Sequence, residues 1–395
     1  MAITGNYWAF TLTDGALRML VVLHFHQLGY TPLQVALLFL FYEIFGVVTN
    51  LVGGWLGARI GLDRTMHLGM GLQILALLML TLPVARLTVP WVMAAQALSG
   101  IAKDLNKMSA KSSIKRLVPG DQPSTLFRWV AALTGSKNAL KGVGFFLGAA
   151  LLSWLGFSAA VGWMAAALLI AWLLSLRTLQ RDLGKSKNTP KFRDIFSKSR
   201  AINLLSAARL FLFAARDVWF VVALPVFLAD SLGWDFRRIG AFLAAWVIGY
   251  GVMQSLAPWF TGRGSGRLPG GRAVFFWAAA LAVIPAIMAA LLVHGQDVQT
   301  VVVVGLSLFG VLFAINSSVH SFLIVSYAAE DGVSLDVGFY YMANAMGRLV
   351  GTLFSGWIFQ IGGLAPCLWV SAACIAVASA ISLGLPQHHR IPLAG

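Results

Sequence analysis

Long apolar runs separated by short polar turns make up most of this chain. Twelve runs can be distinguished, at approximately residues 4–28, 32–59, 65–85, 90–117, 124–153, 157–176, 201–229, 236–262, 273–293, 298–326, 334–362 and 364–385. A helix needs roughly 20 apolar residues to cross a bilayer, and most of the runs are longer, so tilt is expected. The pattern predicts an all-α integral membrane protein with twelve transmembrane helices in two six-helix halves.

One connection is long and polar, residues 177–200 with the sequence RTLQRDLGKSKNTPKFRDIFSKSR. It separates six runs from six runs. We therefore predict an N-terminal six-helix bundle at 1–176, a basic linker with some amphipathic helix at 177–200, and a C-terminal bundle with a short tail at 201–395. The halves look like diverged repeats, because Lys141 and Gly144 in the fifth run parallel Arg348 and Gly351 in the eleventh. Secondary transporters are commonly built from such repeats.

Basic residues are distributed unevenly between alternate connections. The connections on one side, which include 177–200, are rich in Lys and Arg, whereas those on the other carry only Arg86, Arg237 and Arg238. Cytoplasmic loops carry such an excess, so we expect both termini on the cytoplasmic side of the plasma (inner) membrane. The chain is 59% hydrophobic and only 11% charged, which supports the membrane class. The net charge of +15 then reflects orientation in the membrane, and we expect no nucleic-acid partner.

Three lysines interrupt the fourth run at a helical spacing. Lys103, Lys107 and Lys111 recur every four residues, which places them in one stripe about 12 Å long on a helix. A charge at the centre of a membrane helix costs about 2.5–3.5 kcal/mol. We interpret the stripe as one wall of an anion pathway. For Lys111, the alternative is that its side chain reaches the lipid headgroups.

Other runs also carry ionisable residues, and basic side chains outnumber acidic ones. An excess of cations inside the membrane favours a bound anion or a water-filled cavity, and the alternative is a set of structural ion pairs. We predict that Asp104 offsets a neighbouring lysine and that Asp217 pairs with an arginine on another helix. The third, sixth, ninth and twelfth runs carry no charge and are expected to face lipid. The candidate binding cations are Arg18, Lys103, Lys107, Lys137, Lys141, Arg209, Arg216 and Arg348.

Carboxylates within membrane helices often relay protons. The candidates here are Glu43, Asp14 and Asp217. Glu43 is favoured because its own helix carries no basic residue within one or two turns. The alternative is that it pairs with Arg18 or with an arginine of the eleventh run, and the sequence leaves both open.

The sequence lacks the motifs that are typical of enzymes, metal sites and ATPases. The chain has no Ser/His/Asp set, no CxxC or Cys/His cluster and no GxxxxGK[ST] loop. We therefore expect a transporter and not an enzyme, with no cofactor, no metal and no ATP site. Asp14 and Arg18 interrupt the first run, so we expect no cleavable signal peptide.

Three stretches resemble a known family: LTDGALRMLVVLHFHQLGY at 12–30, FYEIFGVVTNLVGGWLGARIGLDRT at 41–65 and SGIAKDLNKMSAKSSIK at 99–115. The twelve runs in two halves resemble the major facilitator superfamily. Its loop between helices two and three matches 54–64 only in part, since Ala58 and Leu62 replace the usual Asp and basic residue. Within that superfamily the chain is similar to the ArsJ organoarsenical efflux permeases, nearly end to end.

The resemblance implies a substrate and a metabolic partner. The substrate would be 1-arseno-3-phosphoglycerate, which a glyceraldehyde-3-phosphate dehydrogenase makes from arsenate. After export, the ester would break down to arsenate and 3-phosphoglycerate, which would confer arsenate resistance. A polyanion of this kind suits the basic residues of both halves. A phosphate or sugar-phosphate exchanger is the alternative, and a membrane-embedded enzyme or sensor is the third hypothesis.

Overall fold

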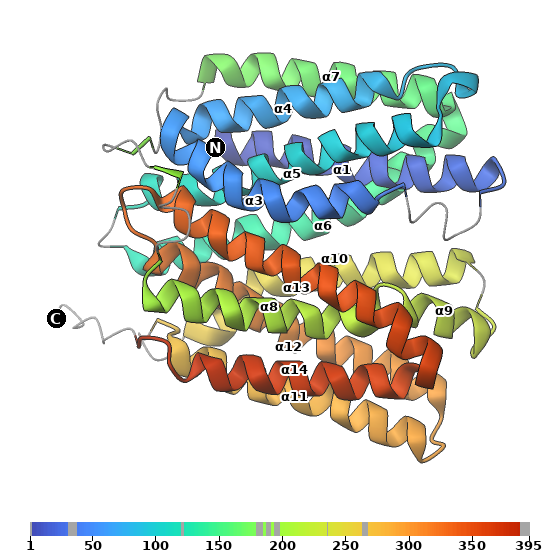
Figure 1. Cartoon of the computed structure of the whole chain (residues 1–395), viewed down its shortest axis with the longest axis vertical. Helices are drawn as coiled ribbons and strands as arrows, with labels where there is room; N and C mark the ends of the chain where they lie inside the picture. The colour runs from blue at the N-terminus through green and yellow to red at the C-terminus, as the bar shows by residue number, and fades with distance from the viewer. Residues whose placement is uncertain are drawn as a thin grey trace. The chain divides into compact units, whose positions relative to one another are not determined.

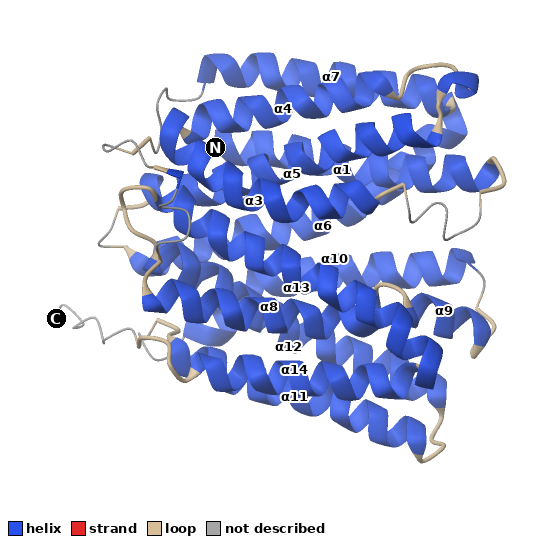
Figure 2. Ribbon diagram, in the orientation of Figure 1, coloured by secondary structure: helices blue, strands red, loops and turns tan. Residues whose placement is uncertain are grey.

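The structure, a computed structural model, describes residues 2–30, 38–119, 122–178, 185–186, 191–192, 198–234, 236–262 and 268–387. Within these ranges the regular structure is helical and no strand is present (Figure 2). The α-helices are α1 (Ala2–Gln27), α3 (Leu40–Ile60), α4 (Leu62–Met79), α5 (Val89–Leu117), α6 (Pro123–Leu155), α7 (Phe157–Thr178), α8 (Arg200–Phe220), α9 (Ala223–Asp230), α10 (Phe236–Gly262), α11 (Gly271–Val293), α12 (Val298–Tyr327), α13 (Val333–Gly362) and α14 (Leu364–Ser382). The predicted all-α class is confirmed.

Each predicted run corresponds to one helix, except that α8 and α9 share the seventh run. In the described part of the chain, eight segments are long and apolar enough to cross a membrane. α1, α4, α5 and α13 are not among the eight. Of these, α1, α5 and α13 carry ionisable residues in their interior, which lowers their mean hydropathy.

Two predicted boundaries differ from the structure because of turns and proline. α3 begins at Leu40 and not at 32, since Leu38 and Phe39 precede it in a turn and 31–37 lie outside the described residues. The seventh run breaks at 221–222. Pro225 has no N–H to bond the carbonyl of Val221, and its ring clashes with that carbonyl. The Ala223 N–H instead donates to the Ser355 hydroxyl at 3.1 Å.

The chain divides into two compact units. Unit 1 consists of residues 1–119, 136–197 and 328–342, and unit 2 of 120–135, 198–327 and 343–395. Each unit contains most of one predicted half. The beginning of α6, up to residue 135, belongs to unit 2, and the beginning of α13, up to residue 342, belongs to unit 1. The predicted division at 176 and 201 stays a prediction.

Unit 1 is held together by a buried apolar core between α1, α4, α5 and α7. Figure 1 shows α4 and α7 side by side. In the core, Phe157 at the start of α7 stacks on His24 of α1 with ring centroids 4.1 Å apart. Close packing of such rings stabilises the contact between the two helices.

Unit 2 has its own core between α8, α11, α12 and α14. α11 and α14 lie side by side in Figure 1. Trp219 of α8 is fully buried in this core. Its indole N–H donates to Ser371 of α14 at 3.2 Å, and its ring packs edge to face on Phe309 of α12.

The predicted repeat is visible in how each unit packs its glycines. A Cβ atom at Gly144 of α6 would lie 2.7 Å from the carbonyl oxygen of Leu12 on α1. A Cβ atom at Gly351 of α13 would lie 2.7 Å from the carbonyl oxygen of Ala214 on α8. Only glycine permits this close approach of two helix backbones. The fifth run packs on the first in unit 1 as the eleventh packs on the seventh in unit 2.

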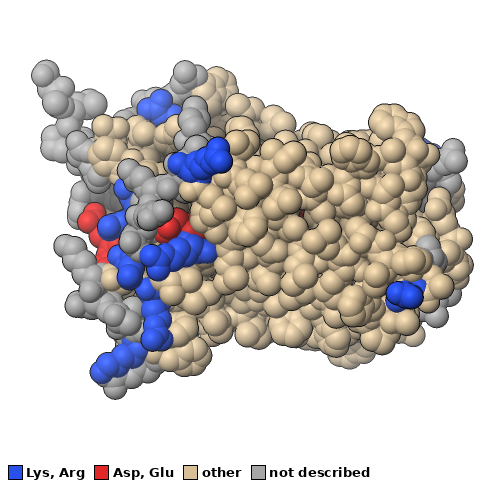
Figure 3. Space-filling model, turned by 90° about the horizontal axis from the view of Figure 1, so that it is seen from above, with Lys and Arg blue, Asp and Glu red and all other residues tan. Residues whose placement is uncertain are grey.

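The surface is predominantly apolar along the helices. Figure 3 shows one face, on which Lys and Arg gather mainly at one end and other residues cover most of the remainder. α7, whose one charged residue is Arg177 in its last turn, exposes large apolar side chains, with Trp163 66% exposed. Such an exposed apolar surface fits contact with lipid.

Part of the basic linker is also described. The Ser186 N–H donates to the carbonyl of Ala58 at 2.8 Å, and Phe192 contacts the Trp55 ring. Both contacts dock the linker on the end of α3. The rest of 177–200, including the predicted amphipathic helix, lies outside the described residues apart from the ends at 177–178 and 198–200, as do 263–267 and the tail from 388.

Candidate functional site

The three lysines of α5 share one face of the helix, as their spacing predicted. Lys103 lies near the middle of this 29-residue helix. The Nζ atoms of Lys107 and Lys111 lie 4.6 and 5.0 Å from the ring centroid of Tyr341 on α13. Both side chains are buried, and Lys111 is only 3% exposed. The alternative that Lys111 extends to the headgroups is therefore wrong, because its ammonium packs on an aromatic ring inside unit 1.

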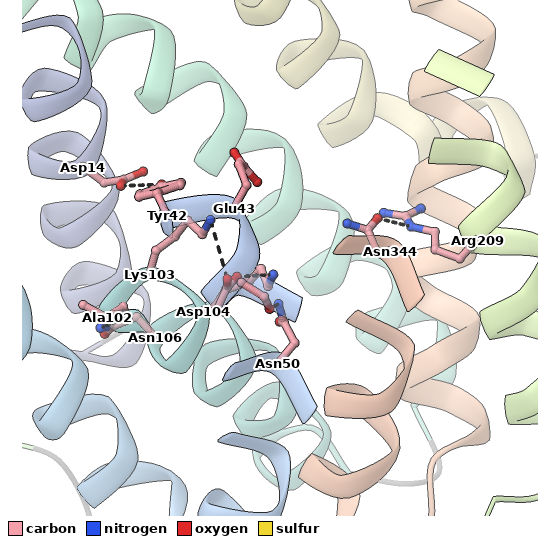
Figure 4. A network of polar contacts seen from close by, with 12 residues as sticks. Asp14, Tyr42, Glu43, Asn50, Ala102, Lys103, Asp104, Asn106, Arg209 and Asn344 are labelled. Atoms are coloured by element: carbon pink, nitrogen blue, oxygen red, sulfur yellow. Dashed lines mark hydrogen bonds and ion pairs between the residues drawn. The ribbon is translucent and has the colours of Figure 1, made fainter. Parts of the chain in front are cut away.

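Asp104 lies among these lysines and is 1% exposed. Its carboxylate is 2.5 Å from the Lys107 Nζ and 3.6 Å from the Lys103 Nζ (Figure 4). The prediction that Asp104 offsets a neighbouring lysine is confirmed. One carboxylate beside three lysines leaves this part of α5 with a net positive charge.

Tyr42 of α3 connects this stripe to α1. Its hydroxyl donates to Asp14 at 2.7 Å, and Figure 4 shows it pointing to that carboxylate. Two cations contact the Tyr42 ring, with the Lys103 Nζ 3.9 Å and the Arg18 Cζ 4.5 Å from its centroid. The sequence did not indicate Tyr42, since no local pattern shows that the residue before Glu43 meets both α1 and α5.

Glu43 has a cationic neighbour in the structure. Its carboxylate lies 3.4 Å from an Arg18 guanidinium nitrogen. This is the ion pair that the sequence left open as an alternative to an isolated carboxylate. Because both side chains are partly exposed, at 24% and 30%, the pair is accessible to solvent or solute.

Two further lysines of unit 1 lie on α6. Lys137 and Lys141 are half-buried and one helical turn apart. The carbonyl of Lys141 lies where α6 crosses α1 at Gly15. The cations predicted in the first half are therefore held on three helices of one unit, α1, α5 and α6.

In unit 2, one buried carboxylate organises two arginines. Asp217 of α8 is fully buried. Its two oxygens lie 2.5 Å from the Arg216 Nε and 3.2 Å from the Arg348 Nε on α13. The predicted pairing of Asp217 with an arginine on another helix is confirmed. The guanidinium groups remain 16% and 31% exposed.

Arg209 of α8 is the most deeply buried of the predicted cations, at 3% exposed. Its Nε donates to Asn344 of α13 at 2.9 Å, as Figure 4 shows, and its Nη1 donates to the Ser317 hydroxyl of α12 at 2.9 Å. The guanidinium carbon lies 4.1 Å from the Phe213 ring. Sequence reasoning missed Asn344 and Ser317, because their roles depend on contacts between distant helices.

Two cation groups are thus described, one within each unit, and each is a candidate site by itself. The unit 1 group holds Arg18, Lys103, Lys107, Lys137 and Lys141, with Tyr42 and Tyr341 among them. The unit 2 group holds Arg209, Arg216 and Arg348. Among the described residues, no cluster of three or more His, Cys, Asp and Glu side chains could hold a metal ion. The arrangement suits the binding of anionic groups by charge and hydrogen bonds.

Comparisons with known proteins address the fold. The Major Facilitator Superfamily profile matches residues 3–223, more than half of the chain. No curated protein matches the sequence. The human organic anion transporter MFSD10 (TETRAN) is similar in structure, with a TM-score of 0.76 at 14% identity, covering 96% of this chain and 98% of that protein.

Two bacterial transporters are similar to a comparable degree. The E. coli fucose:proton symporter FucP has a TM-score of 0.74 at 13% identity, covering 97% of each chain. A bacterial homologue of the iron transporter ferroportin, in an outward-facing state, has a TM-score of 0.73 at 15% identity, covering 97% and 98%. The predicted twelve-helix fold of a multi-pass membrane transporter is confirmed. On its sequence match and its fold, this chain belongs to the Major Facilitator Superfamily.

Proposed function

We propose that this protein is a secondary active transporter that exports an organic oxyanion by alternating access. The observation that carries the proposal is the stripe of Lys103, Lys107 and Lys111 on α5. Lys107 and Lys111 are at least nine-tenths buried, and the Asp104 carboxylate pairs with Lys107 and Lys103 within the stripe. Placing such charges in a membrane protein is costly. A transported anion gives these residues a functional reason to be there.

The substrate that we propose is 1-arseno-3-phosphoglycerate. It carries phosphate at one end and arsenate at the other, so it offers two tetrahedral oxyanions to bind. Arginine can bind such a group through two parallel hydrogen bonds, whereas lysine acts as a compact charge. The candidate site contains both kinds of cation. Arsenic in this ester is bound to oxygen, so no thiolate ligands are required.

The resemblance of 12–30, 41–65 and 99–115 to the ArsJ permeases supports this choice. The resemblance also implies a metabolic partner, a glyceraldehyde-3-phosphate dehydrogenase, and a role in arsenate resistance. The structural likeness to an organic anion transporter is compatible with an anionic substrate. We place the protein in the inner membrane with both termini cytoplasmic, because the basic connections lie on one side.

Transport needs an energy source. The membrane potential favours exit of an anion from a cell that is negative inside, by about 2.3 kcal/mol per charge per 100 mV. Proton coupling through Glu43, Asp14 or Asp217 would add to it. Glu43 is the candidate of choice, since its ion pair with Arg18 at 3.4 Å is partly exposed and protonation would release the arginine.

A phosphate or sugar-phosphate exchanger would use the same cations and is the second candidate function. One experiment separates the two. Everted membrane vesicles would be tested for uptake of radiolabelled arsenate, with and without the dehydrogenase and its substrates. The proposed exporter accumulates arsenic only when the complete enzyme mixture makes the ester. An exchanger accumulates arsenate or phosphate without the enzyme, and that result would refute the arseno-ester as substrate.

A further inference from the structure

The contact between α8 and α12 in unit 2 contains polar residues that the proposed cation groups do not use. We propose that Ser206, Arg209, Asn316 and His320 form a second oxyanion subsite, which binds a phosphate-like or arsenate-like group through neutral hydrogen-bond donors beside one guanidinium. The inference rests on the proposed function in taking an oxyanion as the transported group. It gives a binding role to Ser206, Asn316 and His320, which are not part of the cation groups.

The register of the two helices brings these residues to the same level. Phe213 of α8 packs on Phe313 of α12, with ring centroids 5.3 Å apart. Arg209, four residues before Phe213 on α8, donates to Ser317, four residues after Phe313 on α12. The helices are therefore antiparallel in register. One further turn in the same direction pairs Ser206 with His320.

The spacing of the residues also puts them on the facing surfaces. On α12, Phe313, Asn316, Ser317 and His320 follow the i, i+3, i+4, i+7 pattern of one helix face. Because Phe313 and Ser317 contact α8, Asn316 and His320 lie on the same side. On α8, Ser206, Arg209 and Phe213 follow the same rule.

Hydrogen bonding provides the second, independent observation. Asn316, His320 and Ser206 are 0%, 1% and 2% exposed. Both amide atoms of Asn316, the Nδ1 of His320 and the hydroxyl of Ser206 have no hydrogen-bond partner within the part of the chain that the structure describes. Buried polar groups are normally satisfied, and leaving them unpaired is costly. Three such residues beside a buried arginine indicate a ligand that bonds to all of them.

A tetrahedral oxyanion has the complementary chemistry. Its oxygens accept hydrogen bonds from the Asn316 amide, the Ser206 hydroxyl and an imidazole N–H of His320. Its remaining O–H, when singly protonated, can donate to the Asn316 carbonyl oxygen. Arg209 supplies the positive charge, and its orientation is fixed by Asn344 and Ser317 at 2.9 Å each. Since all four side chains are almost completely buried, the subsite is closed to solvent in this conformation.

The test measures binding and transport separately. Purified full-length protein would be dialysed against radiolabelled inorganic phosphate or arsenate at constant ionic strength. Asn316→Leu should weaken binding about tenfold, the effect of losing a hydrogen bond to a charged group. Ser206→Ala should weaken it severalfold. The matched control is Gln73→Leu on α4 of unit 1. Gln73 is a fully buried amide that also has no hydrogen-bond partner among the described residues, and the variant should bind as wild type.

The outcomes distinguish this subsite from the proposed function. Unchanged dissociation constants in both Asn316→Leu and Ser206→Ala would overturn the subsite, even if proteoliposomes of the wild type still carry the arseno-ester. If proteoliposomes of the wild type transport no oxyanion, the proposed function is wrong. The dissociation constants from dialysis would still test the subsite in that case. If Asn316→Leu does not fold, Ser206→Ala alone decides. Weaker binding of the inorganic ions together with unchanged ester transport would assign the subsite to the free oxyanion.

Discussion

Replacing Asp217 with asparagine should destabilise unit 2, because it leaves two guanidinium groups beside a neutral side chain. Asp217 is fully buried, with the Arg216 Nε at 2.5 Å and the Arg348 Nε at 3.2 Å. Breaking a buried ion pair costs about 3–5 kcal/mol. The arginines are 16% and 31% exposed, so solvent screens part of the lost interaction. We expect a loss at the lower end, about 3 kcal/mol.

The assay is thermal unfolding of the purified protein in detergent, followed by tryptophan fluorescence at a fixed scan rate. A loss of about 3 kcal/mol lowers the apparent Tm by about 6–12 °C for a unit of this size. Asp230→Asn is the control, because Asp230 is exposed at the end of α9. It should melt as wild type.

A double variant tests the cause. Adding Arg348→Gln to Asp217→Asn removes one of the two cations, so part of the lost Tm should return. If Asp217→Asn melts together with the wild type and with Asp230→Asn, the carboxylate does not hold the arginines in place. Asp217 would then be free to act as a proton carrier.

Three more predictions concern coupling, recognition and packing. Glu43→Gln should reduce the dependence of efflux on a pH gradient more than it reduces substrate affinity, as measured in voltage-clamped proteoliposomes; wild-type efflux that ignores the gradient would contradict proton coupling. Arg348→Lys should raise the KM for the ester, since lysine keeps the charge but loses the planar fork, and an unchanged KM would show that the fork is not used. Gly351→Ala should lower the apparent Tm, because its Cβ would lie 2.7 Å from the carbonyl oxygen of Ala214. The control Gly356→Ala, whose Cβ would have no atom within 4 Å, should leave the Tm unchanged, and equal Tm values for the two variants would refute the close helix contact.

The helices could be predicted from the sequence because a membrane imposes a simple rule. A run of apolar residues must satisfy its backbone hydrogen bonds internally, and a helix does so. The break between α8 and α9 was not predicted, although Pro225 is its local cause. Charged residues inside α5 did not prevent it from forming a helix of 29 residues.

The candidate site was predictable where its geometry is local. The stripe of Lys103, Lys107 and Lys111 follows from the helical repeat alone, and Asp104 lies beside it on the same helix. The contacts of Tyr42 and Asn344 and the ion pair of Glu43 join different helices. They depend on which helices pack together and on the register between them. A single sequence does not contain that information, because the contacts join residues far apart in the chain.

The proposed function requires that the cations of unit 1 bind the transported oxyanion. The most direct measurement is uptake of enzymatically made 1-arseno-3-phosphoglycerate by everted vesicles that contain the wild type, Lys103→Ala, Lys137→Ala or Arg128→Ala at equal protein levels. Arg128 is an exposed cation near the start of α6 and serves as the control. The account predicts that Lys103→Ala and Lys137→Ala abolish uptake, while Arg128→Ala retains it. Normal uptake by both lysine variants would contradict the claim.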